Sequence, residues 1–483
     1  MAVLSEYDLI VIGTGSGTEL ASALLQENPK AKIAVIDKDD PGGICLTRGC
    51  IPSKLLIYPA DVVRTIQRAH EFGINVEIKS IDSTAVIARM RSLIDKDINM
   101  IRTGLTNSEN IDFYQTAAEF VSPYTLKVGD KTLTSKMIFL SIGSRPLIPP
   151  IDGLEKTGYL TSDTIIKNTQ LPKSIAIIGG GSIAAEYGHF LSAMGCQVTI
   201  IGRNSQFIAQ EEPEVSALAK REIQKNVTML TGYDVRAVTL TSDGKKKLTA
   251  VNVENQQEAQ VVADEIFVAV GRTSNADILH PEKSGIQIDK KGYIIVDEYM
   301  ETTQPNIWAM GDANGKFLFK HVGNYEAQIV YYNAILKDRT KVDYHIIPHA
   351  VFTDPEIASV GLRESDAVEK YGKDKVLVGF YKYANTAKGE AMNLKDEFVK
   401  VIVEKETSKI LGAHIIGPQA SVLIQEIINL LYTENQSSNT LIRAMHIHPA
   451  LPEVVARAFS SLMTIDQYRH FSNEHLEFFK NQT

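Results

Sequence analysis

Short apolar runs that end at glycine occur at the start of the chain and again in its middle. Residues 7–12 (YDLIVI) precede Gly13, and residues 174–178 (SIAII) precede Gly179. Uninterrupted apolar runs of this length are typical of strands that are buried on both faces of a parallel sheet. After each glycine turn the chain continues with a predicted helix, at 19–26 and 184–194, and then a second apolar run, at 33–36 and 198–201. The sequence therefore predicts two strand–turn–helix–strand units.

The last third of the chain has a different pattern. From about Tyr344 onward, apolar and polar residues alternate in segments such as 399–403 (VKVIV). Alternation with a period of two indicates antiparallel strands that are buried on one face. Residues 60–106 predict two helices joined by a loop. The predicted fold class is α/β, with two Rossmann-like dinucleotide-binding units followed by a C-terminal α+β domain.

The glycine turn of the first unit predicts a phosphate site. Gly13 and Gly15, in the stretch GTGSG, allow the backbone to approach a pyrophosphate, and the helix that follows supplies free N–H groups. Asp37 ends the second strand, where a carboxylate commonly binds ribose hydroxyls; the alternative is a solvated loop charge next to Lys38. A single glycine motif is weak support for nucleotide binding, but two copies in the same structural context are strong support.

The second unit differs from the first at its ribose position. Gly179, Gly181 and Ala184 occupy the small-residue positions of its turn, while Gly202 stands where an NAD enzyme carries an acid. The next residue, Arg203, favours the 2′-phosphate of NADP. Enzymes that use NADP usually carry a further basic residue, which this chain lacks at 204–209. We interpret the pattern as a preference for NADP. NAD stays open, with Arg203 then a loop charge.

Length, charge and cysteine content narrow the class of protein. A chain of 483 residues predicts two to four domains, and its net charge of −8 argues against binding to nucleic acid or to anionic membranes. No apolar run is long enough to span a bilayer, and the first residues lack the features of a secretory signal, so we expect a cytoplasmic protein. Three cysteines do not make a disulfide framework.

Two of the cysteines, Cys45 and Cys50, lie five positions apart in the stretch GGICLTRGCIPSK. They indicate a redox pair rather than a metal site, because no second Cys or His pair follows at ligand spacing. In one continuous helix their Cα atoms would be about 8–9 Å apart, beyond the roughly 7 Å that a disulfide tolerates. A bridge in a helical segment would therefore be distorted and easily reduced. Cys196 precedes an apolar strand and is predicted to lie in the core.

Residues 42–54 resemble the redox motif of the FAD-dependent pyridine nucleotide-disulfide oxidoreductases, and within that family the dihydrolipoamide dehydrogenases most closely. The resemblance extends from Asp8 to about Glu453. It implies that Cys45 is the interchange thiol that meets the substrate and that Cys50 lies against the flavin. Arg48 stands where the family usually has an apolar residue. Its charge either stabilises a thiolate or points to solvent.

The same resemblance assigns further residues to the site. Lys54 and Glu186 are expected to pair near the flavin N5, where hydride arrives. The segments 139–146, 267–275 and 307–312 resemble family segments around the FAD site, and 307–312 carries the aspartate that holds the ribityl chain. Together with the two glycine turns, they give these further cofactor-binding positions: Gly43, Gly143, Gly271, Gly311 and Asp312.

The C-terminal stretch HIHPALPE, residues 446–453, resembles the family motif HxHPTxxE. The resemblance implies that His448 is the acid–base for the interchange thiol and that Glu453 orients its imidazole. In the family this histidine reaches the disulfide of the other subunit, so the resemblance implies a homodimer. Ala450 stands where the family often has threonine.

The resemblance also implies a domain order and a function. The expected domains are a first FAD segment at 1–150, an NAD(P) domain at 151–275, a second FAD segment at 276–345 and an interface domain at 346–483. Electrons would pass between NAD(P)H, FAD, the two cysteines and an external dithiol or disulfide. The predicted substrate is dihydrolipoamide on the lipoyl domain of a 2-oxoacid dehydrogenase or glycine cleavage complex.

Two alternatives to the lipoamide enzyme stay open. One is an NADPH-dependent reductase of a small disulfide of the glutathione or mycothiol kind, which Arg203 favours. The other is a flavoprotein subunit without catalytic activity. The complete set of Cys45, Cys50, His448 and Glu453 argues against this second alternative.

Overall fold

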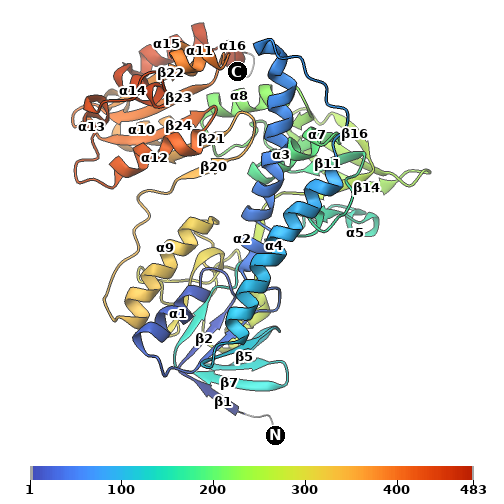
Figure 1. Cartoon of the computed structure of the whole chain (residues 1–483), viewed down its shortest axis with the longest axis vertical. Coiled ribbons are helices and arrows are strands. Elements are labelled where there is room, and N and C mark those ends of the chain that lie inside the picture. Colours follow the sequence, from blue (N-terminus) through green and yellow to red (C-terminus); the bar gives the residue numbers. More distant parts are fainter. Residues whose placement is uncertain (1–3, 481–483) are drawn as a thin grey trace.

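The computed structural model describes residues 4–480 and contains three bodies, each built on its own large sheet (Figure 1). The first body has a five-stranded parallel sheet in the order β19-β8-β2-β3-β4 and a four-stranded sheet in the order β1-β7-β6-β5. Their bounds are β1 (Leu4–Tyr7), β2 (Leu9–Ile12), β3 (Ile33–Ile36), β4 (Ile111–Tyr114), β5 (Ala118–Ser122), β6 (Thr125–Val128), β7 (Lys131–Ser135), β8 (Ile138–Leu140) and β19 (Ile307–Ala309).

The helices of the first body include two long ones that extend along the second body in Figure 1. The bounds are α1 (Thr18–Glu27), α2 (Gly43–Thr47), α3 (Cys50–Arg68), α4 (Ser83–Thr106) and α9 (Lys320–Val330). Two helices were expected in residues 60–106 and are confirmed. The first of them begins ten residues earlier than predicted, at Cys50, because its first two turns already pack against α7 of the second body.

The second body repeats the plan of the first. Its parallel sheet has the order β10-β17-β11-β12-β13, and a three-stranded antiparallel sheet, β14-β15-β16, lies beside it. The strand bounds are β10 (Leu160–Thr161), β11 (Ser174–Ile178), β12 (Gln197–Gly202), β13 (Thr228–Thr231), β14 (Tyr233–Leu240), β15 (Lys246–Asn252), β16 (Glu258–Ala263) and β17 (Glu265–Val268). The helices are α5 (Leu154–Thr157), α6 (Ser162–Ile165), α7 (Ser182–Ala193) and α8 (Pro213–Ile223).

The third body is the predicted antiparallel sheet, covered by helices. All its strand pairs are antiparallel, in the order β20-β21-β24-β23-β22-β25. The strands are β20 (His349–Val351), β21 (Ile357–Gly361), β22 (Val376–Lys382), β23 (Phe398–Glu404), β24 (Ile410–Ile416) and β25 (Leu462–Thr464). The helices are α10 (Glu364–Tyr371), α11 (Ala387–Ala391), α12 (Ala420–Leu431), α13 (Ser438–Arg443), α14 (Pro452–Ser460), α15 (Ile465–His475) and α16 (Glu477–Lys480).

The first body is assembled from two separate parts of the chain. β19 and α9 follow the whole of the second body in sequence, yet β19 pairs with β8 as an edge strand of the first parallel sheet. A two-stranded antiparallel link, β9 (Ser144–Pro146) with β18 (Arg272–Ser274), joins the chain where it leaves the first body to where it returns. The second body is thus inserted into the first.

The apolar runs of the sequence form the cores of the two parallel sheets. All residues of β2 and β3, and the last four of β11, are buried. Cys196, directly before β12, is also buried, as predicted. The strands predicted at 33–36 and 174–178 have the bounds that the sequence indicated, because a continuous apolar run is a strong local signal.

A buried lysine joins the second body to the third. Lys400, on β23, is fully buried, and its Nζ lies 3.0 Å from Glu212, 3.1 Å from Glu214 and 2.9 Å from Glu364. Tyr468, on α15, donates a hydrogen bond of 2.9 Å to Glu214. Burial disfavours the lysine's charge, but the surrounding carboxylates raise its pKa well above the ordinary value, so it stays protonated.

The last two helices add an apolar contact to the same junction. α16 packs against α8. The ring of Phe478, on α16, stacks on the ring of Phe398 with their centroids 6.2 Å apart, and the guanidinium of Arg221 lies 5.3 Å from the centroid of the Phe478 ring. α16 therefore joins the third body to the second.

Among residues 4–480, every helix is too short or too polar to cross a bilayer. The same residues contain no group of three or more His, Cys, Asp or Glu side chains that is arranged to bind a metal ion.

Candidate active site

The redox stretch is not one helix. α2 ends at Thr47, and α3 begins anew at Cys50 after two residues with non-helical dihedral angles. Gly49 is required at this break, since a Cβ on it would lie 2.8 Å from the carbonyl oxygen of Ile44. Cys45 and Cys50 therefore lie in two separate helices, and a disulfide between them would not have to distort one continuous helix. The break brings the thiols of Cys45 and Cys50 into contact, and both are free.

The pKa values of the two thiols shift in opposite directions. The hydrogen bond from Cys45 and the charge of Lys54 lower the pKa of Cys50 to about 7, against a desolvation that raises it. The hydrogen bond that Cys45 donates and its desolvation raise the pKa of Cys45, and the charge of Lys320 opposes this. In the reduced pair the proton therefore stays on Cys45 and the negative charge on Cys50.

The expected contact between Lys54 and Glu186 is present. Lys54 lies one turn after Cys50 on α3, and its Nζ is 2.7 Å from the Glu186 carboxylate on α7. Glu186 also accepts a hydrogen bond of 3.1 Å from the backbone N–H of Phe352, whose ring lies 4.5 Å below the ammonium. Residues from all three bodies thus converge beside Cys50.

Arg48 does not point to solvent. Its guanidinium lies 2.6 Å from Asp39, in the loop after β3, and 3.1 Å from Asp163, on α6. The largest causes of the pKa shifts of the two cysteines do not include Arg48. The solvent alternative is therefore wrong, because Asp163 comes from a segment that is distant in sequence, and the thiolate alternative stays a prediction. Arg48 is an ion-pair bridge between the first two bodies.

A cavity of about 520 Å³ runs past the cysteines and collects most of the predicted cofactor positions. The predicted residues that line it are Gly13, Gly15, Asp37, Gly43, Cys45, Cys50, Lys54, Gly143, Glu186, Gly271, Gly311 and Asp312. Gly43 packs so closely on the phosphate turn that a Cβ on it would lie 2.6 Å from the Cα of Gly15. A bare backbone cradle of this kind fits a pyrophosphate.

The two predicted carboxylates of the cavity are fixed by hydroxyl groups. Asp37 accepts hydrogen bonds from the backbone N–H of Thr14, at 2.8 Å, and from its hydroxyl, at 2.5 Å. Asp312 accepts a hydrogen bond of 2.5 Å from Ser144 and lies 3.8 Å from the guanidinium of Arg272. Asp37 therefore shapes the phosphate turn as well as facing the cavity, which the sequence did not indicate.

Four predicted cofactor positions of the second unit lie outside this cavity: Gly179, Gly181, Ala184 and Arg203. Ala184, in the first turn of α7, is fully buried, so its small side chain serves the close packing of helix on sheet. Its predicted contact with the cofactor stays a prediction. Arg203 follows the last residue of β12 and is exposed.

His448 and Glu453 lie apart from the cysteines of their own chain. The Nδ1 of His448 is 2.9 Å from the Glu453 carboxylate, and this hydrogen bond lowers the pKa of Glu453. A carboxylate on Nδ1 leaves Nε2 to exchange a proton. The His448 side chain is 71% exposed and does not line the cavity.

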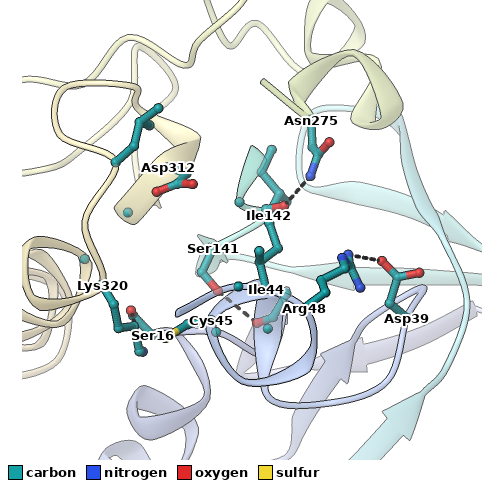
Figure 2. A pocket seen from close by; sticks show the side chains of 18 of the residues that line it. Ser16, Asp39, Ile44, Cys45, Arg48, Ser141, Ile142, Asn275, Asp312 and Lys320 are labelled. Carbon is teal, nitrogen blue, oxygen red and sulfur yellow. Dashed lines mark hydrogen bonds and ion pairs between the residues drawn. The ribbon is translucent and has the colours of Figure 1, made fainter. Parts of the chain in front are cut away.

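Sequence reasoning missed several cavity residues. Lys320 starts α9 next to Phe319, Arg272 contacts Ser144, and Asn275 donates a hydrogen bond of 2.9 Å to the carbonyl of Ile142 (Figure 2). Asn275 and Arg272 lie in the segment 267–275 that resembles the family, but nothing in that segment alone shows that they return to the cavity after the inserted body. A lysine at the first position of a helix was a usable signal for Lys320, since it opposes the helix dipole.

Comparison with known proteins identifies the family. Residues 7–330 match the profile of the pyridine nucleotide-disulphide oxidoreductases, and residues 347–459 match the dimerisation domain of the same family. The chain belongs to the pyridine nucleotide-disulphide oxidoreductase family. Its fold is glutathione-reductase-like, with two dinucleotide-binding domains and the family's dimerisation domain.

Individual members of the family match almost the whole chain. A mycothione reductase of Mycobacterium tuberculosis is 35% identical over 95% of this chain and 100% of its own. A dihydrolipoyl dehydrogenase of Chlamydia trachomatis is 32% identical over 96% and 98%. Among solved structures, the HOCl-induced flavoprotein disulfide reductase RclA of Escherichia coli, as a Cu(II) complex, has a TM-score of 0.83 at 25% identity, over 94% and 99%.

Membership of the family establishes the class of chemistry. The chain is a flavoprotein disulfide oxidoreductase whose cofactors are FAD and NAD(P). The residues present fit FAD, since a glycine cradle, two fixed carboxylates and a cysteine pair line one cavity.

Proposed function

We propose that this chain is an NADPH-dependent reductase of a low-molecular-weight disulfide, acting as a cytoplasmic homodimer. The observation that supports it best is the reduced cysteine pair, in which Cys50 has a pKa of about 7 beside the Lys54–Glu186 pair. A thiolate held at neutral pH next to a thiol is suited to disulfide exchange.

The residues of the chain divide the reaction into two exchanges. When bound, FAD supplies the transfer of a hydride from the nicotinamide to the Cys45–Cys50 disulfide. His448 of the partner subunit takes the proton of the Cys45 thiol, the resulting thiolate attacks one substrate sulfur, the substrate S–S bond breaks, and the first thiol leaves with that proton. Cys50 next attacks the Cys45 sulfur, the cysteine disulfide re-forms, and the second thiolate leaves. Two electrons reach the substrate in total.

Oxidation of dihydrolipoamide is the second candidate. The stretch from Cys50 to Lys54 resembles the lipoamide enzymes, and a dihydrolipoyl dehydrogenase is 32% identical to this chain. The mycothione reductase, at 35%, and Arg203, which follows Gly202 at the position of the ribose-binding acid, favour the small disulfide. The same cysteine pair serves both directions, so the substrate must be found by assay.

The deciding experiment measures turnover of the purified holoprotein with both groups of substrate. Mycothiol disulfide and glutathione disulfide are offered with NADPH and with NADH, and dihydrolipoamide is offered with NAD and with NADP. Fast oxidation of NADPH by a small disulfide supports the proposal. Fast turnover of dihydrolipoamide alone would replace it with the lipoamide function. No dithiol turnover with FAD bound would favour a non-catalytic subunit.

Cofactor choice gives a separate prediction about Arg203. We expect Arg203→Glu to lower kcat/KM for NADPH by about tenfold or more, because a carboxylate repels the 2′-phosphate that the guanidinium attracts. The value for NADH should stay level or rise. Arg236→Glu, which removes an exposed arginine that pairs with Asp234, is the matched control. An unchanged NADPH-to-NADH ratio would make Arg203 a loop charge.

A further inference from the structure

Lys320 occupies an unusual place in the cavity. It is the first residue of α9, and it lines the same cavity as Cys45. Figure 2 shows its side chain beside Ser16 and the sulfur of Cys45. Its Nζ donates a hydrogen bond of 3.0 Å to the hydroxyl of Ser16, which in turn donates one of 3.0 Å to Asn324. The ammonium group is therefore fixed at the cavity wall by a neutral partner.

The other cations of the cavity are all paired with carboxylates. Their pairs are Lys38 with Asp39, Arg48 with Asp39 and Asp163, Lys54 with Glu186, and Arg272 with Asp312. Within residues 4–480, no carboxylate lies within 4.0 Å of the Lys320 ammonium. Its charge is thus available to an anion that forms in the cavity.

The position of Lys320 on its helix costs stability. A cation in the first turn of a helix opposes the macrodipole. The helix N-terminus and the ammonium together make this wall of the cavity positive. An unfavourable interaction of this kind is expected where a residue is kept for its function rather than for the stability of the fold.

The charged groups around the two cysteines indicate which anion the Lys320 ammonium acts on. Cys45 faces Cys50 from α3 and Lys320 from α9, and the charge of Lys320 lowers the pKa of Cys45. Cys50 faces Lys54 and Glu186. Arg48 is held by Asp39 and Asp163 and is not among the largest causes of either shift.

We propose that Lys320 is a positioning residue that supplies the counter-charge for the Cys45 thiolate, the form that attacks the substrate disulfide. Each cysteine then has a cation of its own, Lys54 for Cys50 and Lys320 for Cys45. This assignment rests on the proposed function, because it deepens the first exchange step. The competing assignment is the pyrophosphate of FAD, since Ser16 belongs to the phosphate turn.

The test isolates the Cys45 thiol in the FAD-loaded protein. A Cys50→Ser background removes the hydrogen bond between the two cysteines, and dithiothreitol keeps the remaining thiol reduced. Alkylation by iodoacetamide is followed across a pH series, and mass spectrometry assigns the label to Cys45. We expect Lys320→Gln, which keeps a hydrogen-bond donor for Ser16 but no charge, to raise the midpoint by about one pH unit.

Two further variants and one cofactor measurement complete the test. Lys320→Arg should keep the low midpoint, and Lys316→Gln, an exposed lysine of the same segment, should not shift it. An unchanged midpoint in Lys320→Gln would overturn the proposal. Release of FAD by Lys320→Gln with an unchanged midpoint would assign the charge to the pyrophosphate and also overturn it. Failure of NADPH to free any alkylatable thiol in the unsubstituted protein would instead remove the proposed function.

Discussion

At the scale of single residues, the cysteine pair shows how contacts divide chemical roles between identical side chains. Cys45 donates a hydrogen bond to Cys50, and Lys54 favours the negative charge on Cys50. The difference comes from the break at Gly49, which directs both thiols to one point. Two positions that the sequence marks alike therefore have different protonation states.

The role of Cys45 can be tested directly. We expect Cys45→Ser to lower turnover of the disulfide substrate by at least about 10³-fold, because a hydroxyl cannot form the mixed disulfide, while FAD stays bound. Flavin absorbance and steady-state kinetics measure the two effects. Cys196→Ser is the matched control, since that cysteine is buried in the core of the second body. Unchanged turnover in Cys45→Ser would refute the disulfide mechanism.

The acidity of Cys50 provides a pH prediction. With a pKa of about 7, its thiolate is present above that pH and protonated below it. Lys54→Met should raise this pKa, by about one unit, because a favourable charge is lost and Glu186 is left unpaired. The ultraviolet absorbance of the thiolate in the reduced protein measures the titration.

Arg48→Leu is the matched control for Lys54→Met. It removes a cation from the same redox stretch, but that cation is neutralised by Asp39 and Asp163. We expect the titration of Cys50 to stay near its original value. An upward shift equal to that of Lys54→Met would show that Arg48 acts on the thiolate.

At the scale of elements, α8, β23 and α15 meet around one buried ammonium. Lys400 compensates Glu212, Glu214 and Glu364, so removing it leaves several buried carboxylates unpaired. We expect Lys400→Met to lower the free energy of unfolding by about 3–5 kcal/mol. Chemical denaturation measures the free energy of unfolding, and Lys405→Met, which removes an exposed lysine, is the control. Equal stability of the two variants would contradict the assigned role.

The elements also show how far sequence reasoning extends. The strands at 33–36 and 174–178 and the antiparallel third sheet follow from local apolar patterns, and the glycine turns and cysteines follow from motifs. The partners of Arg48 and Lys320 do not follow. Lys320 and Ser16 are 304 positions apart, and only the completed fold brings them together. Contacts between segments that are distant in sequence carry no local signal, and the site depends on them.

At the scale of the whole molecule, the histidine that we propose as the acid–base and the cysteines of one chain lie in different places. His448 is exposed and does not line the cavity of its own chain, whereas residues 347–459 match a dimerisation domain. Both facts fit the proposed homodimer, in which His448 of the partner subunit completes each site. A single chain would then have every component but no complete site.

Mixing two inactive variants tests this arrangement. A dimer of one Cys45→Ser chain and one His448→Ala chain contains one intact site if the histidine acts on the other subunit. Random mixing makes half the dimers mixed, so about a quarter of the unsubstituted activity should return. Each variant alone is the control. No recovery after subunit exchange, verified by mass spectrometry, would place the histidine in its own chain's site.

The insertion of one body into another has a consequence for biosynthesis. β8 and the rest of the first parallel sheet leave the ribosome early, but their neighbour β19 is translated only after the entire second body. The second body is continuous in sequence, so it can finish folding while the first still lacks an edge strand. Domains usually mature in the order of translation. Here the nascent chain should complete its middle domain before its beginning, and FAD should be captured only after β19 and α9 have emerged.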